Sequence, residues 1–196
     1  MSLIDTWVPS QVKKEKSIFD IIPVDVRSYI RQLIPSLGSA IFLAGGSIAD
    51  CYRGVVPKDI DLWCIVSSMH GMPDEATLAG KTFIHHTSGL YSKDTAEVYT
   101  CNELALPIDL IYIKTKLTAI EVINMFDMDI ARAGVFNLIT QEWKIQFGEA
   151  AIKRALDTKT IHYSLQTPLT ASSVKSAKHL ARYKLKYPDF KFIEVP

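Results

Sequence analysis

The sequence predicts a mixed α/β (α+β) fold, in which a mixed β-sheet is flanked by helices and followed by a short helical C-terminal appendage. Short apolar runs that are typical of strands alternate with segments of helical periodicity along most of the chain. Hydrophobic residues make up 48% of the 196 residues and charged residues 22%, which favours a packed core over global disorder. Residues 148–196 contain two further helical patterns, which we expect to form the appendage.

Turn and cap residues mark the boundaries of the predicted elements. Apolar residues recur near helical spacing between Pro23 and Gly38, and these two residues are typical of the start and the end of a helix. A later helix begins at Thr170 or a neighbouring serine and is ended by Pro188. Helices are expected over residues 23–38, 46–54, 118–126, 149–160 and 170–188. Strands are expected over residues 40–45, 59–66, 81–88, 96–104, 107–114, 129–139 and 143–148, and a loop over 67–80.

The chain divides into three predicted parts. Residues 1–22 combine Trp7 and Pro9 with a lysine cluster, and we expect a loosely held N-terminal arm. Residues 23–147 contain all the predicted strands and form the main domain. Residues 148–196 form the helical appendage, which we expect to pack on that domain.

Charge, cysteine content and hydropathy exclude several classes of protein. The formal net charge of +1 argues against a strongly basic nucleic-acid binder, although it allows a local basic patch. Cys51, Cys64 and Cys101 have no CxxC spacing and lie in apolar stretches, which is typical of reduced core thiols in a cytoplasmic protein. No segment approaches the roughly 18 apolar residues that a membrane helix needs, so we expect no membrane partner.

Three aspartates interrupt apolar strands. Asp59 and Asp61 point to the same side of their strand, since side chains alternate across it. Carboxylates held this close repel each other unless a cation lies between them or both reach water. Asp109 is a third acid inside an apolar strand, and if the two strands are neighbours, three oxygen ligands converge. Such a set suits Mg²⁺, and a pair of ions about 4 Å apart can activate a hydroxyl and hold a leaving pyrophosphate.

A Gly-Gly-Ser turn precedes these acids. Gly45 and Gly46 follow a strand and open into a short helix, so backbone N–H groups can approach an anion closely. The start of the helix adds a partial positive charge. Ser47 can donate a hydrogen bond to a phosphate oxygen. The turn and the acids together indicate phosphoryl or nucleotidyl transfer.

These motifs resemble the DNA polymerase beta-like nucleotidyltransferase superfamily. The stretch "GGSIADCYRGVVPKDIDL" is most similar to the head domain of tRNA nucleotidyltransferases and poly(A) polymerases, whose pattern has two glycines, an Arg-Asp pair, a further glycine and two alternating acids. Ala49 stands where the family usually has an arginine. The role of that arginine is therefore lost or is taken by Arg53. The matching positions are Gly45, Gly46, Asp50, Gly54, Asp59 and Asp61.

A second stretch extends the resemblance, which covers residues 40–137. "FDMDIAR" is similar to a family segment near the bound nucleotide; Asp127 matches its acid and Arg132 departs from it. The resemblance implies that residues 23–147 are a nucleotidyltransferase catalytic domain. Its implied catalytic and metal-binding residues are Asp59, Asp61 and Asp109, with Mg²⁺ as the cofactor and Mn²⁺ as a substitute. Its implied nucleotide-binding residues are Gly45, Gly46, Ser47, Asp50, Arg53, Asp127 and Arg132.

The C-terminal helix is basic and aromatic. Lys175, Lys178 and Arg182 recur at helical spacing, and His179, Arg182 and Lys186 form a second, overlapping row. We expect Lys175, Lys178, Arg182 and Lys186 to contact triphosphate or RNA backbone; a closing helix with a solvated basic face is the alternative.

The implied reaction moves an NMP from an NTP such as ATP to an acceptor hydroxyl and releases pyrophosphate. The resemblance favours an RNA 3′ end as acceptor, so an NTP and RNA are the expected partners and tRNA processing the expected role. Two alternatives stay open. One is a catalytically silent nucleotide- or partner-binding module of the same fold. The other is a toxin-like enzyme that modifies a protein or a tRNA.

Overall fold

The computed structural model describes residues 17–37, 40–66, 74–86, 96–165 and 173–195. Most of the predicted arm, residues 1–16, lies outside this part of the chain. The remainder of the arm contains a 3-10 helix, η1 (Ile18–Ile21). Ser17 and Asp20 form a capping box that fixes the start of η1.

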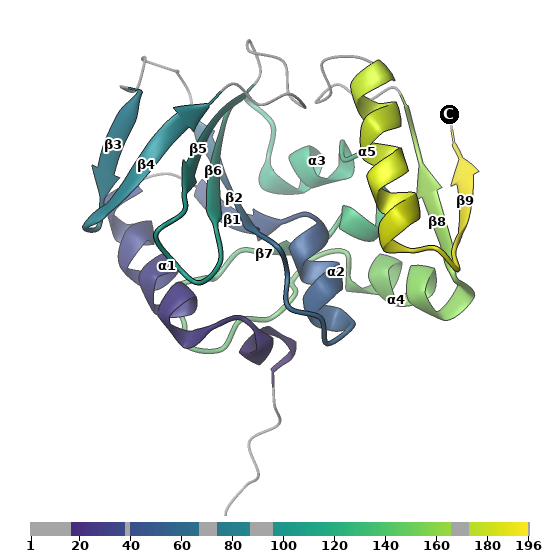
Figure 1. Ribbon diagram of the computed structural model, residues 1–196, viewed down its shortest axis with the longest axis horizontal. Coiled ribbons are helices and arrows are strands. Elements are labelled where there is room, and N and C mark those ends of the chain that lie inside the picture. The colour runs from purple at the N-terminus through teal and green to yellow at the C-terminus, as the bar shows by residue number, and fades with distance from the viewer. Residues whose placement is uncertain (1–16, 38–39, 67–73, 87–95, 166–172, 196) are drawn as a thin grey trace, which may run out of the picture.

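A mixed seven-stranded sheet forms the centre of the molecule, as the sequence predicted (Figure 1). The strand order is β3-β4-β5-β6-β2-β1-β7. Strands β2 and β6 are parallel to each other, and the other neighbours in this sheet are antiparallel. The strands span Ala40–Ala44 (β1), Ile60–Val66 (β2), Glu75–Leu78 (β3), Lys81–His86 (β4), Ala96–Cys101 (β5), Ile108–Lys114 (β6) and Gly134–Val135 (β7).

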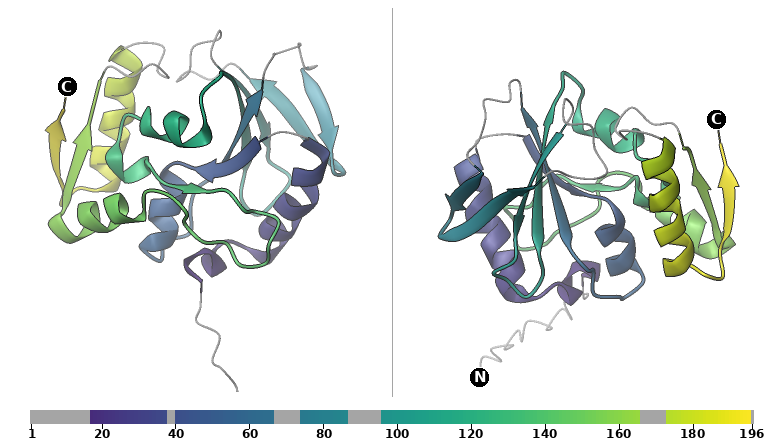
Figure 2. Two further views of the ribbon diagram at one scale, coloured as in Figure 1. Left: turned by 180° about the vertical axis from the view of Figure 1, so that it is seen from behind. Right: turned by 45° about the horizontal axis from the view of Figure 1, so that its top comes forward.

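Helices flank the sheet, and α1 and α5 lie at opposite sides of the molecule (Figures 1 and 2). Helix α1 buries Val26, Ile30 and Leu33 on one stripe, as its predicted periodicity requires. No helix in the described ranges combines the length and apolar character needed to cross a membrane. The helices span Val24–Leu37 (α1), Gly46–Tyr52 (α2), Ala119–Asn124 (α3), Asp129–Ala131 (η2, 3-10), Glu149–Thr158 (α4) and Ser173–Lys186 (α5).

The C-terminal part contains a β-α-β unit. Strands β8 (Thr160–Tyr163) and β9 (Lys191–Glu194) pair in parallel, and α5 forms the crossover between them. The sequence predicted α4 and α5 but neither strand. His179 and Lys186 contact Asp127 and Asp50, so α5 is held against the main domain rather than extending from it (Figure 1).

Aromatic side chains link the central strands to the segment that follows α3. Trp63 on β2 is 2% exposed, and its ring centroid lies 6.5 Å from that of Phe42 on β1. On another side it lies 4.9 Å from the ring of Phe126. Aromatic contacts of this kind contribute beyond the area that they bury. The core therefore holds the segment after α3 against the sheet.

Three predicted elements were wrong in part or entirely. The predicted strand 129–139 contains the 3-10 helix η2, and only Gly134–Val135 pairs with the sheet. The predicted strand 143–148 contributes only an isolated antiparallel bridge between Phe147 and Gly134. The predicted loop 67–80 contains β3, which continues the sheet by antiparallel pairing with β4.

Gly148 fixes how the chain enters α4. Its φ is +81°, and a Cβ atom there would overlap the Arg132 carbonyl oxygen and lie 2.8 Å from the Ala133 Cα. Gly54 has a similar φ of +71° but open space around it. We expect Gly148→Ala to lower the free energy of unfolding by about 2 kcal/mol, and Gly54→Ala by about 1 kcal/mol from backbone strain alone. Urea titration of both variants measures the difference; equal losses would contradict a steric role for Gly148.

Candidate active site

Asp61 and Asp109 lie side by side in the centre of the sheet. They are directly paired in the register between β2 and β6, so their side chains leave the same face of two adjacent strands. The sequence left open whether the two strands are neighbours, and the structure pairs them directly. The Thr100 hydroxyl on β5 donates a hydrogen bond of 2.5 Å to Asp109 Oδ1 and orients that carboxylate.

The ionised form of Asp61 is electrostatically unfavourable. Burial raises the pKa of Asp61 well above its usual value, and the negative charges of Asp59 and Asp109 raise it further. The positive charges of Arg182 and Lys186 act in the opposite direction. Because the folded state binds this proton more tightly than the unfolded state does, the ionised Asp61 costs stability at neutral pH. A cation beside it relieves that cost.

The Gly-Gly-Ser turn lies against Asp61. The φ of Gly45 is +105°, and a Cβ atom on it would lie 2.9 Å from Asp61 Oδ2, so only glycine lets the backbone come this close. Ser47 is the second residue of α2 and is 5% exposed. Its hydroxyl is buried and has no hydrogen-bond partner among the described residues. A buried hydroxyl without a partner indicates a place for a ligand acceptor.

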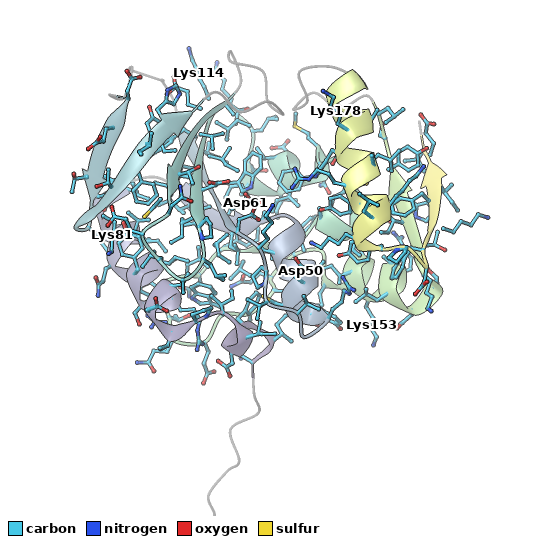
Figure 3. All side chains as sticks on the ribbon, viewed as in Figure 1. Asp50, Asp61, Lys81, Lys114, Lys153 and Lys178 are labelled. Carbon is cyan, nitrogen blue, oxygen red and sulfur yellow. The ribbon has the colours of Figure 1, made fainter. Side chains whose placement is uncertain are left out.

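Asp50 on α2 is bound by the C-terminal helix. Lys186 Nζ donates a hydrogen bond of 2.6 Å to Asp50 Oδ2 (Figure 3 labels Asp50). Burial raises the pKa of Asp50, and the hydrogen bond and charge of Lys186 oppose this rise. Arg53 is less closely engaged: its guanidinium lies 3.9 Å from Asp50 Oδ1 and 4.6 Å from the centre of the Tyr187 ring. The cation nearest Asp50 therefore comes from α5.

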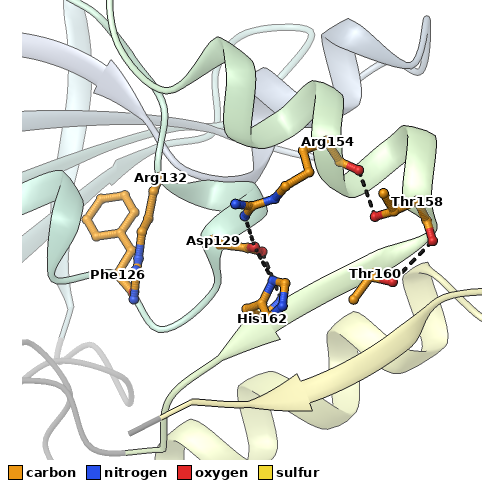
Figure 4. A network of polar contacts seen from close by, with 7 residues as sticks. All are labelled: Phe126, Asp129, Arg132, Arg154, Thr158, Thr160 and His162. Atoms are coloured by element: carbon orange, nitrogen blue, oxygen red, sulfur yellow. Dashed lines mark hydrogen bonds and ion pairs between the residues drawn. The ribbon is translucent and has the colours of Figure 1, made fainter.

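The second predicted nucleotide-binding stretch also meets α5. Asp127 is 5% exposed, and its Oδ2 lies 2.6 Å from His179 Nδ1. Arg132 turns back on its own segment, because its Nε donates to the Phe126 carbonyl over 2.8 Å (Figure 4 shows both residues). Asp127 is thus close to the site elements, whereas Arg132 has a structural contact.

Asp129 anchors the C-terminal unit and was not predicted as a functional residue. Its carboxylate accepts hydrogen bonds from Arg154 on α4 over 2.6 Å and from the His162 backbone N–H on β8 over 3.1 Å (Figure 4). The His162 ring Nδ1 lies 3.0 Å from the same carboxylate. The available signal was an acid in an apolar segment, the pattern that singled out Asp109. This cluster joins η2, α4 and β8, and so holds the unit that contains α5.

One of the two predicted rows of α5 faces the acids. His179, Arg182 and Lys186 act on Asp127, Asp61 and Asp50 respectively. In the other row, Lys178 is exposed, and the side chain of Lys175 lies outside the described residues. Tyr183 lies one helical turn after His179 and is 7% exposed. The aromatic character of this helix was predicted, but no role was assigned to Tyr183.

The described residues form no ready-made metal cage. Nowhere in the ranges that the structure describes is a group of three or more histidine, cysteine, aspartate or glutamate side chains placed so that it could hold a metal ion. Magnesium is often bound through one or two carboxylates together with substrate phosphates and water. The Asp61–Asp109 pair fits that mode of binding, in which the nucleotide completes the coordination.

The architecture is similar to that of part of the CCA-adding enzymes of known structure. No protein-family model matches the sequence, and no curated protein sequence matches it either. Among solved structures, the chain is similar to the Thermotoga maritima CCA-adding enzyme complexed with tRNA-CCA, with a TM-score of 0.58, 15% identity and 91% of this chain covered. Complexes of CCA-adding enzyme with ATP and with CTP match with TM-scores of 0.58 and 0.57, at 15% and 12% identity over 89% of this chain.

The chain spans about two fifths of the length of these structures, with 41% to 42% of each covered. At this level of identity the likeness establishes the fold. It confirms the predicted head-domain architecture, with a mixed sheet and flanking helices.

Proposed function

We propose that the protein is a metal-dependent nucleotidyltransferase that moves an NMP from an NTP to an acceptor hydroxyl and releases pyrophosphate. The observation that supports this best is the direct pairing of Asp61 and Asp109 on parallel strands, beside a glycine turn whose Ser47 hydroxyl is buried without a partner. Such a pair is unfavourable without a cation. Similar folds are seen in complexes with ATP, CTP and tRNA.

Each acid has a proposed role. Asp59 and Asp61 would hold two divalent ions, Mg²⁺ or Mn²⁺, and Asp109 would complete the site beside the acceptor hydroxyl. When bound, the ions supply charge stabilisation for the attacking and leaving oxygens. Thr100 holds Asp109 in position through its hydrogen bond. The crowding of Asp61 by Asp59 and Asp109 is the feature that a hard cation relieves.

The nucleotide is proposed to lie between the turn and α5. Gly45, Gly46 and Ser47 bind the β- and γ-phosphates, and Lys186 and Arg182 supply positive charge from the opposite side. Asp127 is proposed to contact ribose or base, together with its partner His179. Asp50 positions Lys186 for this task.

The proposed acceptor is an RNA 3′ end. Its support is the similar fold complexed with tRNA, and the exposed Lys178 on α5 as a contact for the RNA backbone. Lys175 is proposed to contribute a second backbone contact.

Transfer of a label to RNA tests the proposed function. Pure protein is incubated with each α-labelled NTP, Mg²⁺ and a mixed RNA pool, and we expect labelled RNA from the wild type. The Asp59→Ala/Asp61→Ala variant serves as the control and should give none. Label on protein instead of RNA would favour the modifying-enzyme alternative. NTP binding without any transfer would favour the silent binding module.

A further inference from the structure

We propose that Tyr183 is a phosphate-binding residue, whose hydroxyl donates a hydrogen bond to the same phosphoryl group as Ser47. This inference rests on the proposed function and adds to it a residue from the C-terminal β-α-β unit. The site is then formed by two parts of the chain, the glycine turn at residues 45–47 and helix α5.

The Tyr183 hydroxyl lies directly in front of the glycine turn. A Cβ atom on Gly46 would be 2.8 Å from Tyr183 Oη and 3.6 Å from Lys186 Nζ, and the nearest atoms around that point belong to these two side chains. A phosphate that approaches the Gly46 backbone therefore meets a hydroxyl donor and an ammonium group. Both are groups that bind phosphate oxygens.

Ser47 gives an independent indication of a ligand at the same turn. Its side chain is 5% exposed, and its hydroxyl has no hydrogen-bond partner among the described residues. Buried hydroxyls are normally satisfied, so an acceptor group supplied by a ligand accounts for this one. Ser47 follows Gly46 in the chain and the Tyr183 hydroxyl lies near Gly46, and a single phosphoryl group has enough oxygens to accept from both.

The Tyr183 ring is held firmly in its orientation. It packs edge-on against His179 at a centroid distance of 4.9 Å, and it stacks on Tyr187 at 5.9 Å. The neighbouring rungs of α5 are fixed by the Lys186–Asp50 and His179–Asp127 contacts, each of 2.6 Å. A donor that is already oriented loses little entropy when its ligand binds.

The hydroxyl also keeps its proton. Burial raises the pKa of Tyr183 well above its usual value, and the charges of Tyr187, Asp127, Asp61 and Asp50 raise it further. Tyr183 is thus a neutral donor at physiological pH. It can approach a phosphate without adding negative charge to a site that already contains several acids.

Tyr183→Phe tests the proposal, because it removes the hydroxyl and keeps the ring. Affinities for pyrophosphate and for the NTPs are measured by calorimetry in the presence of Mg²⁺. We expect Tyr183→Phe to weaken both affinities about tenfold, the usual effect of one hydrogen bond to a charged group. Tyr163→Phe is the matched control, since it removes a tyrosine hydroxyl on β8 that already contacts Glu194, and we expect its affinities to stay within about twofold of the wild type.

Unchanged or tighter binding by Tyr183→Phe would overturn the proposal, since the hydroxyl would then be a bystander or a competitor for the turn. A wild type that binds neither pyrophosphate nor any NTP would overturn the proposed function along with it. If Tyr183→Phe folds poorly, a measurement on the wild-type protein tests the same contact. The NMR signal of ζ-¹³C-labelled Tyr183, assigned by its loss in Tyr183→Phe, should shift when pyrophosphate is added, and no shift would contradict the contact.

Discussion

An Asp61→Asn variant is expected to lose nucleotidyl transfer by at least about a thousandfold and yet to melt at a higher temperature than the wild type. The loss follows because metal-ion stabilisation of the reacting oxygens is worth several kcal/mol, and each 1.4 kcal/mol is a factor of ten in rate. The gain follows because the amide keeps the shape of the side chain and removes a charge that is crowded by Asp59 and Asp109. Relief of like-charge pairing is worth about 1 kcal/mol, or about 3 °C in this size range.

The gain in melting temperature of Asp61→Asn is expected to depend on pH. The pKa of Asp61 is raised in the folded state, so wild-type stability from this group is complete below the unfolded pKa and is lost as pH rises through the folded pKa. The melting-temperature advantage of Asp61→Asn should therefore be present at neutral pH and shrink towards pH 4. Asp25→Asn on the exposed start of α1 is the matched control, with little change in either property. A lower melting temperature for Asp61→Asn, or retained transfer, would contradict the assignment.

Lys186→Met is expected to weaken NTP affinity about a hundredfold and to lower the free energy of unfolding by about 2 kcal/mol, because truncating one partner of a hydrogen-bonded charge pair leaves the other charge unpaired. Here the charge left behind is Asp50, whose side chain is 6% exposed. The affinity falls for a separate reason, since the ammonium group beside Gly46 is lost as a phosphate contact.

A double variant separates these two effects. Lys186→Met/Asp50→Asn removes both charges, so we expect its stability to return close to that of the wild type while NTP affinity stays low. Urea titration and calorimetry measure the two quantities on the same samples. If the double variant recovers affinity as well as stability, then Lys186 acts only through the structure. If Lys186→Met binds NTP more tightly, then α5 obstructs the turn.

The sequence was most informative where local pattern determines the structure. Strand alternation predicted that Asp59 and Asp61 act on one another, and the charge of Asp59 does raise the pKa of Asp61. The apolar stretch around Asp109 predicted a strand, which the structure pairs with β2. The glycine turn could be predicted because few residues other than glycine adopt the φ of +105° found at Gly45. Such features can be predicted because they depend on residues that are close together in the sequence.

The sequence was less informative where distant segments meet. Nothing near Asp50 indicates that its partner is Lys186, 136 positions later in the chain, because that contact depends on how the C-terminal unit docks. Strands β8 and β9 were missed because each is four residues long and gives too short a pattern. The predicted strand 129–139 was wrong because Asp129 is drawn into hydrogen bonds with Arg154 and His162, and tertiary contacts then override local preference.

The acids on β2 and β6 are synthesised before the basic residues of α5. Asp61 and Asp109 emerge from the ribosome well before Arg182 and Lys186, and domains tend to fold from the N-terminus during synthesis. A growing polypeptide would therefore pair its two central strands while the cations that face them are still missing. On the proposed function, a divalent ion would supply the counter-charge until α5 is made, so a chain that lacks α5 should depend more on that ion for protease resistance than the full chain does.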